Sequence, residues 1–326
     1  MTQQQPSAVA VLATGGTIQN TLGGRIPVQQ LIDEVLAQDR EVAFDVPEFV
    51  VHDGLRVGSE DLEPRDWVRI AAAAQELADR PDVTGIVVTH GTYTVEETAF
   101  FLHLTVNTSK PIVLTCSQRK HGVVGNDGDR NLIDAIRAAQ QLGPGAGAVL
   151  VSGEEVHSAR EVYKSNQRPG GFASDKLGLL GSAELDQVSL YRRPTRRHTA
   201  TSEFSARSLP DELPQVDILV TYVGATAGLL AAAVDEGAAG VVLAGFAPAG
   251  RPGPGQHDLI IDLRRRDVPV VVTSRGRGGR VPHETLWPDC WITGDNLSPF
   301  KARILLMVAL AAGLTGNDLQ RVFDEY

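Results

Sequence analysis

Apolar residues gather in short continuous runs along the chain, and amphipathic stretches separate these runs. The runs are rich in Val, Ile, Leu and Ala and do not alternate with polar residues. This pattern is typical of strands in a parallel sheet that helices cover on both faces. Seven runs predict strands, over residues 8–15, 85–91, 111–116, 146–153, 217–224, 240–247 and 268–274.

Between these runs, apolar residues recur with the spacing of a helix. Five stretches predict helices: Pro64–Asp79, Val95–Val106, Asp129–Leu142, Ala225–Asp235 and Lys301–Ala312. Strands that alternate with helices along the chain indicate an α/β fold with right-handed crossovers.

The alternation lapses over one polar stretch that contains Pro, YRRPTRRHTATSEFSARSLPDELP, residues 191–214. A chain of 326 residues is long enough to bury two cores. We therefore predict an N-terminal α/β domain with the catalytic loops over residues 1–195, a linker over 196–213 and a C-terminal α/β domain over 214–326.

Composition and charge narrow the class of protein. Apolar residues make up 42% of the chain and charged residues 21%, which is ordinary for a soluble globular protein. The formal net charge of −10 argues against a nucleic-acid surface. No apolar run approaches the roughly 18–20 residues of a membrane span, and the start, MTQQQPS, lacks the pattern of an export signal. We expect a cytoplasmic protein that has neither a nucleic-acid nor a membrane partner.

Small polar residues follow three of the predicted strands. They form the loops ATGGT (13–17), THGTYT (89–94) and LTCSQ (114–118). In open parallel sheets, ligands bind beyond the carboxyl ends of the strands. The glycines in the first two loops would let backbone approach a ligand closely. These loops are candidate site elements, although strand–Gly–Gly turns also occur in α/β proteins that bind nothing there.

Five stretches of the chain resemble the bacterial-type L-asparaginase/glutaminase amidohydrolases. They are LATGGTI (12–18), VVTHGTYTVEETAFFLHLTV (87–106), NDGDRNL (126–132), REVYKSN (160–166) and LSPFKAR (297–303), in the family's order. The resemblance implies a two-domain asparaginase-like fold, with a mostly parallel sheet flanked by helices in a larger N-terminal domain and a smaller α/β C-terminal domain. It also implies a homo-oligomer, dimer or tetramer, with sites near the subunit interface, and a small-molecule amide substrate.

The resemblance implies catalytic roles for three residues. Thr17 corresponds to the family's nucleophile, and Thr92 and Lys164 correspond to the group that handles the proton. In the implied two-step acyl transfer, the hydroxyl attacks the amide carbonyl, ammonia leaves and water hydrolyses the acyl-enzyme, with the Thr92 N–H as oxyanion donor. The chemistry is consistent, because a threonine needs a base and oxyanion donors and desolvation can make a lysine basic. The plainer alternatives are that Thr17 caps a helix and that Lys164 is a surface cation.

Two positions beside this machinery depart from the family pattern. Tyr93 stands where the family has an aspartate that pairs with the lysine and receives the substrate's α-ammonium group. The neutral phenol should lower the pKa of Lys164, and its ring could stack on a planar amide or hydrogen-bond the lysine. Ser59 matches a serine of the family's substrate-carboxylate loop, but Glu60 replaces a neutral glutamine. Glu60 either restores the anion that position 93 lost or points to solvent.

Further predicted contacts are less well defined. Gly91 and Ser117 complete the predicted substrate-binding set, and Ser117 stands where the family has alanine. The family's lid supplies a tyrosine, whereas residues 18–43 contain none and offer Arg25 instead, either for a carboxylate or as a surface cation. Glu284 is the candidate for a glutamate that the family contributes across the subunit interface.

The sequence therefore predicts an L-asparaginase-type amidohydrolase that hydrolyses L-asparagine or a related small amide through a threonyl acyl-enzyme. Two alternatives stay open, because the acyl-transfer residues match the family and several recognition positions do not. One is an amidase of the same fold that acts on a different amide, cyclic amide or imide. The other is a non-catalytic protein that binds a small molecule. The two cysteines and eight histidines form no metal-ligand pattern, so we expect no metal and no cofactor, and we interpret His90 as structural.

Overall fold

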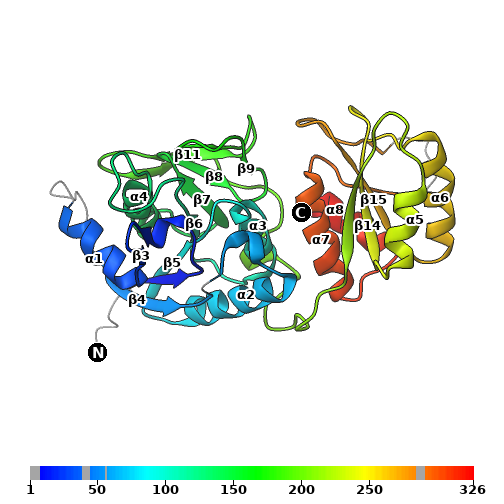
Figure 1. The fold of residues 1–326 in the computed structure, drawn as a ribbon. Coiled ribbons are helices and arrows are strands. Elements are labelled where there is room, and N and C mark those ends of the chain that lie inside the picture. Colours follow the sequence, from blue (N-terminus) through cyan, green and yellow to red (C-terminus); the bar gives the residue numbers. More distant parts are fainter. Residues whose placement is uncertain (1–7, 39–44, 56, 284–290) are drawn as a thin grey trace. The chain divides into compact units, whose positions relative to one another are not determined.

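The structure, a computed structural model, describes residues 8–38, 45–55, 57–283 and 291–326. The chain divides into two compact units, Met1–Ser208 and Leu209–Tyr326. Each unit has its own sheet with helices on both faces (Figure 1). The α/β class and the mostly parallel sheet of the N-terminal unit confirm the sequence prediction.

Among the described residues, the N-terminal unit is built on an eight-stranded sheet in the order β12-β11-β8-β7-β6-β5-β1-β4. Strands β4, β1, β5, β6 and β7 are parallel, and β8, β11 and β12 extend the sheet in antiparallel pairs. The parallel strands are Ala8–Ala13 (β1), Glu48–Asp53 (β4), Val83–Thr89 (β5), Ile112–Thr115 (β6) and Ala148–Ser152 (β7). The antiparallel strands are Glu155–Ser158 (β8), Leu179–Ala183 (β11) and Val188–Leu190 (β12).

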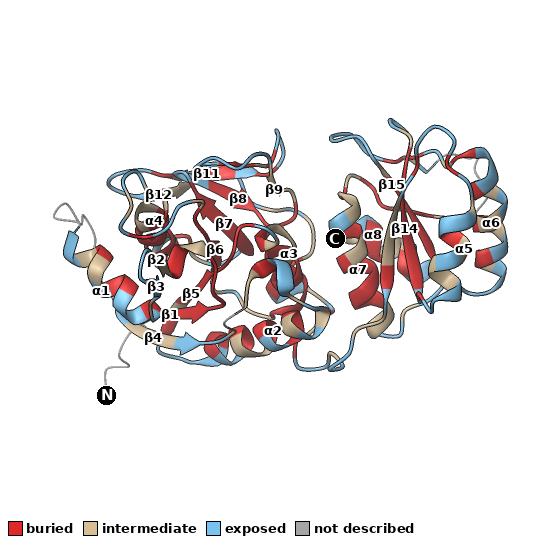
Figure 2. Cartoon of the chain, viewed as in Figure 1, coloured by how far each residue is buried: buried red, intermediate tan, exposed pale blue. Residues whose placement is uncertain are grey.

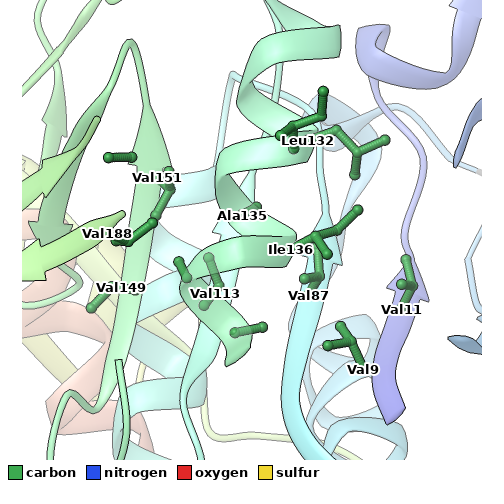
Figure 3. Close-up of a cluster of buried hydrophobic side chains, with 14 of the residues drawn as sticks. Val9, Val11, Val87, Val113, Leu132, Ala135, Ile136, Val149, Val151 and Val188 are labelled. Carbon is green, nitrogen blue, oxygen red and sulfur yellow. The ribbon is translucent and has the colours of Figure 1, made fainter. Parts of the chain in front are cut away.

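Helices cover both faces of this sheet. On one face lie α1 (Val28–Gln38) and α4 (Gly128–Gln141), and on the other lie α2 (Pro64–Asp79) and α3 (Val95–Thr105). Helix α4 packs its apolar side onto the strands, and Figure 3 shows Leu132, Ala135 and Ile136 facing the valines of the sheet. These side chains are fully buried. In Figure 2, where buried residues are red, the strands that α4 covers are mostly red as well. Each buried Val, Leu or Ile contributes roughly 1.5–3 kcal/mol to folding, so the loops at the strand ends stand on a rigid base.

Short elements attach to the ends of these strands. The 3-10 helix η1 (Thr17–Gln19) follows β1 and leads into a hairpin of β2 (Asn20–Thr21) and β3 (Gly24–Arg25). A second 3-10 helix, η2 (Ser59–Asp61), precedes α2. The pair β9 (Tyr163–Lys164) and β10 (Phe172–Ala173) forms a separate two-stranded ribbon.

The C-terminal unit has a parallel sheet in the order β13-β14-β15-β16. Its strands are Val216–Val220 (β13), Gly240–Gly245 (β14), Val270–Ser274 (β15) and Ile292–Thr293 (β16). Helices α5 (Gly228–Asp235) and α6 (Pro254–Arg265) cover one face, and α7 (Pro299–Ala311) and α8 (Asn317–Glu325) cover the other. No helix in the described ranges is both long and apolar enough to cross a bilayer.

The stretch at residues 196–208, which the sequence assigns to the linker, groups with the N-terminal unit. It contains the short helix η3 (Thr199–Thr201). Phe204 and Ala206 are buried, and the Ala206 N–H donates to the carbonyl of Thr105 at 2.7 Å. These contacts attach the stretch to the end of α3.

Candidate active site

The loops that follow β1, β5 and β6 lie together at one edge of the N-terminal sheet. The backbone N–H and the hydroxyl of Thr14 both donate to the carbonyl of Thr89, at 3.0 and 2.8 Å. The N–H of His90 donates to the carbonyl of Thr115 at 2.9 Å. Parallel strands bring their carboxyl ends to the same edge, so the three loops that the sequence singled out are neighbours.

The first two loops touch through two glycines. A Cβ at Gly16 would lie 2.5 Å from both the nitrogen of Gly91 and the carbonyl oxygen of His90. Gly16 also has φ 90°, a conformation in which a side chain is strained. Thr17 and Thr92 each follow one of these glycines, so they lie on two loops whose backbones touch. Thr17 opens η1 and Gly16 is its N-cap, so Thr17 does not cap this helix.

Lys164 meets the second loop from the ribbon β9–β10. Its Nζ donates to the Thr92 Oγ1 at 2.7 Å, across 72 residues of chain. The backbone N–H of Lys164 donates to Oε2 of Glu96, in the first turn of α3, at 2.8 Å. Burial lowers the pKa of the Lys164 ammonium, and the negative charge of Glu96 opposes this shift only in part. A lower pKa favours the neutral amine, which is the form that can accept a proton.

The ring of Tyr93 lies against the same ammonium. The Lys164 Nζ is 4.9 Å from the ring centroid, so the ring face meets the cation. Such a contact contributes about 0.5–1 kcal/mol at an exposed site. Tyr93 is 66% exposed, so it is open to a ligand.

Ser59 supports the second loop from η2. Its hydroxyl accepts a hydrogen bond from the Tyr93 N–H at 3.3 Å, and its carbonyl accepts one from the Thr94 hydroxyl at 2.8 Å. A Cβ at Gly91 would lie 2.4 Å from the Ser59 Oγ, so only glycine allows this approach. Ser59 is buried, and its hydroxyl can still donate its own proton.

Glu60 and Ser117 are placed differently from each other. Glu60 is exposed, and its carboxylate folds back over its own loop, with Oε2 2.8 Å from where a Cβ at Gly58 would be. Ser117 is buried, and its hydroxyl donates to the carbonyl of Arg119 at 2.8 Å. The proton of Ser117 is therefore engaged within its own loop. Substrate contacts by these two residues stay predictions.

A buried hydrogen-bond chain, which the sequence did not reveal, fixes the carbonyl of Gly91. The indole N–H of Trp67 donates to the Thr98 hydroxyl at 3.0 Å, and this hydroxyl lies 2.9 Å from Nε2 of His90. Nδ1 of His90 lies 2.8 Å from the carbonyl oxygen of Gly91. A neutral ring protonated on Nδ1 satisfies every member of the chain. Burial lowers the pKa of His90 to about 4, and the structural interpretation of this histidine is confirmed.

Metal ligands, Cys116 and Glu284 remain to be placed. In the part of the chain that the structure describes, no group of His, Cys, Asp and Glu side chains is arranged to hold a metal ion. Cys116 is buried, and burial raises the pKa of its thiol, so it behaves as a small apolar group in the core. Glu284 lies outside the described residues.

Comparison with known proteins places the chain among the asparaginases. The family model "Asparaginase, N-terminal" matches residues 8–196, and the model "Glutaminase/Asparaginase C-terminal domain" matches residues 215–323. The chain belongs to the asparaginase family. These two matches fall on the two units of the structure.

Individual members of the family align with nearly the whole of this chain. L-asparaginase 2 of Bacillus subtilis is 33% identical over 98% of this chain and 86% of its own length. L-asparaginase 2 of Escherichia coli is 32% identical over 98% of this chain and 93% of its own length. The crystal structure of a probable cytoplasmic L-asparaginase from Campylobacter jejuni is 31% identical, with a TM-score of 0.89 over 98% of this chain and 100% of that one.

Proposed function

We propose that the protein hydrolyses the carboxamide of a small substrate through an acyl-enzyme on Thr17, with release of ammonia. The asparaginase family and its bacterial members support an amidohydrolase that acts on a non-peptide amide. One observation carries the assignment of residues. Lys164 donates to the Thr92 hydroxyl at 2.7 Å, on the loop whose Gly91 touches the backbone just before Thr17.

The proposed mechanism uses groups on two touching loops. The neutral amine of Lys164 withdraws a proton through the Thr92 hydroxyl as the Thr17 oxygen attacks the amide carbon. The Thr92 backbone N–H has no hydrogen-bond partner among the described residues and donates to the oxyanion. The intermediate collapses when Lys164 returns the proton to the leaving nitrogen, and ammonia departs. Water, deprotonated by the same pair, then hydrolyses the ester on Thr17.

The substrate is less narrowly defined than the reaction. Relatives named L-asparaginase and glutaminase-asparaginase support L-asparagine or a related small amide. Tyr93 favours a second candidate, an amide or cyclic imide without an α-ammonium group, because a neutral ring cannot pair with that charge as a carboxylate does. Tyr93 is 66% exposed, so the ring face that Lys164 does not cover can stack on a planar group.

Ammonia release tests the proposal. Wild-type protein and the Thr17→Ala variant are assayed with a panel of linear amides and cyclic imides, each with and without an α-amino group. Release by the wild type that Thr17→Ala abolishes supports the proposal, and the preferred member identifies the substrate class. Tight binding of a panel member with no ammonia release would instead indicate a non-catalytic binding protein.

We further propose a homo-oligomer, dimer or tetramer, with sites near the subunit interface. The family membership and exposed apolar side chains in the C-terminal unit support it: Tyr222, Val223 and Leu229 are 52%, 91% and 61% exposed. Light scattering after gel filtration tests it, and a monomer at micromolar concentration would contradict it. A cytoplasmic location is supported by the similar structure of a probable cytoplasmic L-asparaginase from Campylobacter jejuni, although a Haemophilus influenzae relative is named a probable periplasmic L-asparaginase. Cell fractionation decides between these locations.

A further inference from the structure

A short hairpin holds Arg25 close to the turn that contains the proposed nucleophile. In this hairpin, Asn20 of β2 pairs with Arg25 of β3. Just before and after them, the N–H of Ile26 donates to the carbonyl of Gln19 at 2.9 Å, and the side-chain amide of Gln19 donates back to Ile26 at 3.4 Å. Gln19 is buried. Since Gln19 lies in the same 3-10 turn as Thr17, these bonds hold Arg25 close to that turn.

The guanidinium of Arg25 lies against the glycine turn that precedes Thr17. A Cβ at Gly15 would lie 3.1 Å from both Nη1 and Nη2 of Arg25, and 3.0 Å from the carbonyl oxygen of Val57. Both outer nitrogens therefore lie near the place where the Gly15 turn meets the carbonyl of Val57, in the loop that leads to Ser59. Gly15 itself has φ 100°, so the turn requires glycine, and the missing side chain admits the guanidinium.

Arg25 has no ion pair or hydrogen bond through its guanidinium among the described residues. Burial lowers the pKa of Lys164, the other cationic side chain of the candidate site. Arg25 is a permanent positive charge beside the turn that precedes Thr17. Its planar fork matches a carboxylate through two parallel charge-assisted hydrogen bonds.

We propose that Arg25 binds the carboxylate of the substrate, and that this carboxylate is the charge by which the substrate is recognised. The inference rests on the proposed function, since it places the scissile amide at Thr17. Two residues of chain span at most about 7 Å between their Cα atoms, and Thr17 is two residues beyond Gly15, against which the guanidinium lies. A short molecule therefore suits a carboxylate at Arg25 and an amide at Thr17, so the substrate class is the monoamide of a short dicarboxylic acid. An α-amino group is dispensable in this class, because position 93 offers it no anion.

Four amides separate the two charges of the substrate: succinamate carries only the carboxylate, asparagine carries both groups, 3-aminobutanamide carries only the amine and butanamide carries neither. Initial rates of ammonia release give kcat and KM for the wild type, Arg25→Gln and Arg25→Lys. Arg69→Gln is the matched control, because Arg69 is an exposed cation on α2 that pairs with Asp66. Thermal unfolding checks that each variant keeps its fold.

We expect Arg25→Gln to raise the KM for succinamate and asparagine about 10- to 100-fold, with a smaller change in kcat. It should leave kcat/KM for butanamide and 3-aminobutanamide within about twofold of the wild type. Arg25→Lys should restore part of the loss, since it keeps the charge without the fork. Arg69→Gln should match the wild type on all four substrates.

Two results would overturn the inference while leaving the proposed function intact. One is an equal loss on all four amides, which would mean that Arg25 only supports the hairpin. The other is an unchanged KM for succinamate in Arg25→Gln. If the wild type releases ammonia from none of the four, the proposed function is in doubt, and calorimetry of succinamate binding then decides about Arg25. Binding that Arg25→Gln abolishes supports the inference, and absent or unaltered binding overturns it.

Discussion

The two sides of the candidate site are held in different ways. The proposed reaction side, Thr92 with Lys164, is joined by a 2.7 Å hydrogen bond and stands on β5 and on the buried His90 chain. The proposed recognition side, with Tyr93, Glu60 and Arg25, is exposed. Substitutions at exposed loop positions change the free energy of unfolding little. On the proposed assignment, the sheet constrains the residues of the reaction closely, whereas substrate choice is left to residues that can change without loss of the fold.

The largest expected effect comes from removing the proposed nucleophile. Thr17→Ala should lower the rate of ammonia release by at least about 10,000-fold, because no acyl-enzyme can form. Thr84→Ala is the matched control, since Thr84 lies near the opposite end of β5 and its hydroxyl donates to the carbonyl of Ala8. Substantial turnover by Thr17→Ala would show that another residue attacks the amide.

Removing the proposed base should have the next largest effect. Lys164→Met should lower kcat/KM by about 100- to 10,000-fold, which is the usual contribution of a general base. In the wild type, activity should rise with pH as Lys164 loses its proton, at a pKa below the ordinary lysine value of 10.5. A pH profile of kcat/KM measures both effects. The same rise in Lys164→Met would show that a different group titrates.

Restoring a carboxylate at position 93 sharpens the comparison between the two sides. Tyr93→Asp places an anion beside Lys164, so the pKa of the lysine should rise by about 1 unit or more and the activity profile should move to higher pH. The variant should also favour amides with an α-amino group by about tenfold or more over those without. Tyr93→Phe keeps the ring face and should keep the wild-type profile. A Tyr93→Asp profile that coincides with the wild type would mean that position 93 does not influence Lys164.

The smallest effect concerns stability beneath the reaction side. The pKa of His90 in the folded protein is about 4, against an ordinary value of 6.5, so the unfolded chain binds more protons between these values. The free energy of unfolding should therefore fall as the pH drops from 6.5 to 4, by at most about 3 kcal/mol from this residue. Urea unfolding of wild type and His90→Gln at several pH values measures the contribution. Equal pH slopes in the two proteins would contradict it.

The buried pattern of the chain was sufficient to predict much of the fold. All seven predicted strands and all five predicted helices occur, with ends displaced by a few residues. Strand β4 was missed because it is a partly exposed edge strand without a continuous apolar run. Strands β8, β11 and β12 are short antiparallel additions, and α6 begins in a stretch rich in Gly and Pro. In such segments tertiary contacts outweigh the local pattern.

Part of the candidate site could also be predicted, because the buried strands determine which loops lie together. Loops at the ends of parallel strands must meet, so Thr17 and Thr92 could be placed near each other from the sequence. The ring face of Tyr93 under Lys164 and the guanidinium of Arg25 on Gly15 depend on how ribbons and hairpins turn after the strands end. No spacing along the chain encodes those turns. The support of His90 by Trp67 likewise joins two elements with no local signal.

The central claim is that the Thr17 hydroxyl accepts the acyl group, and mass spectrometry tests it most directly. Enzyme turning over its preferred amide is quenched in acid within milliseconds and digested, and the peptides are searched for the mass of the acyl group. The account predicts an adduct on Thr17 that disappears in Thr17→Ala together with ammonia release. An adduct on another residue, or ammonia released at an undiminished rate by Thr17→Ala, would contradict it.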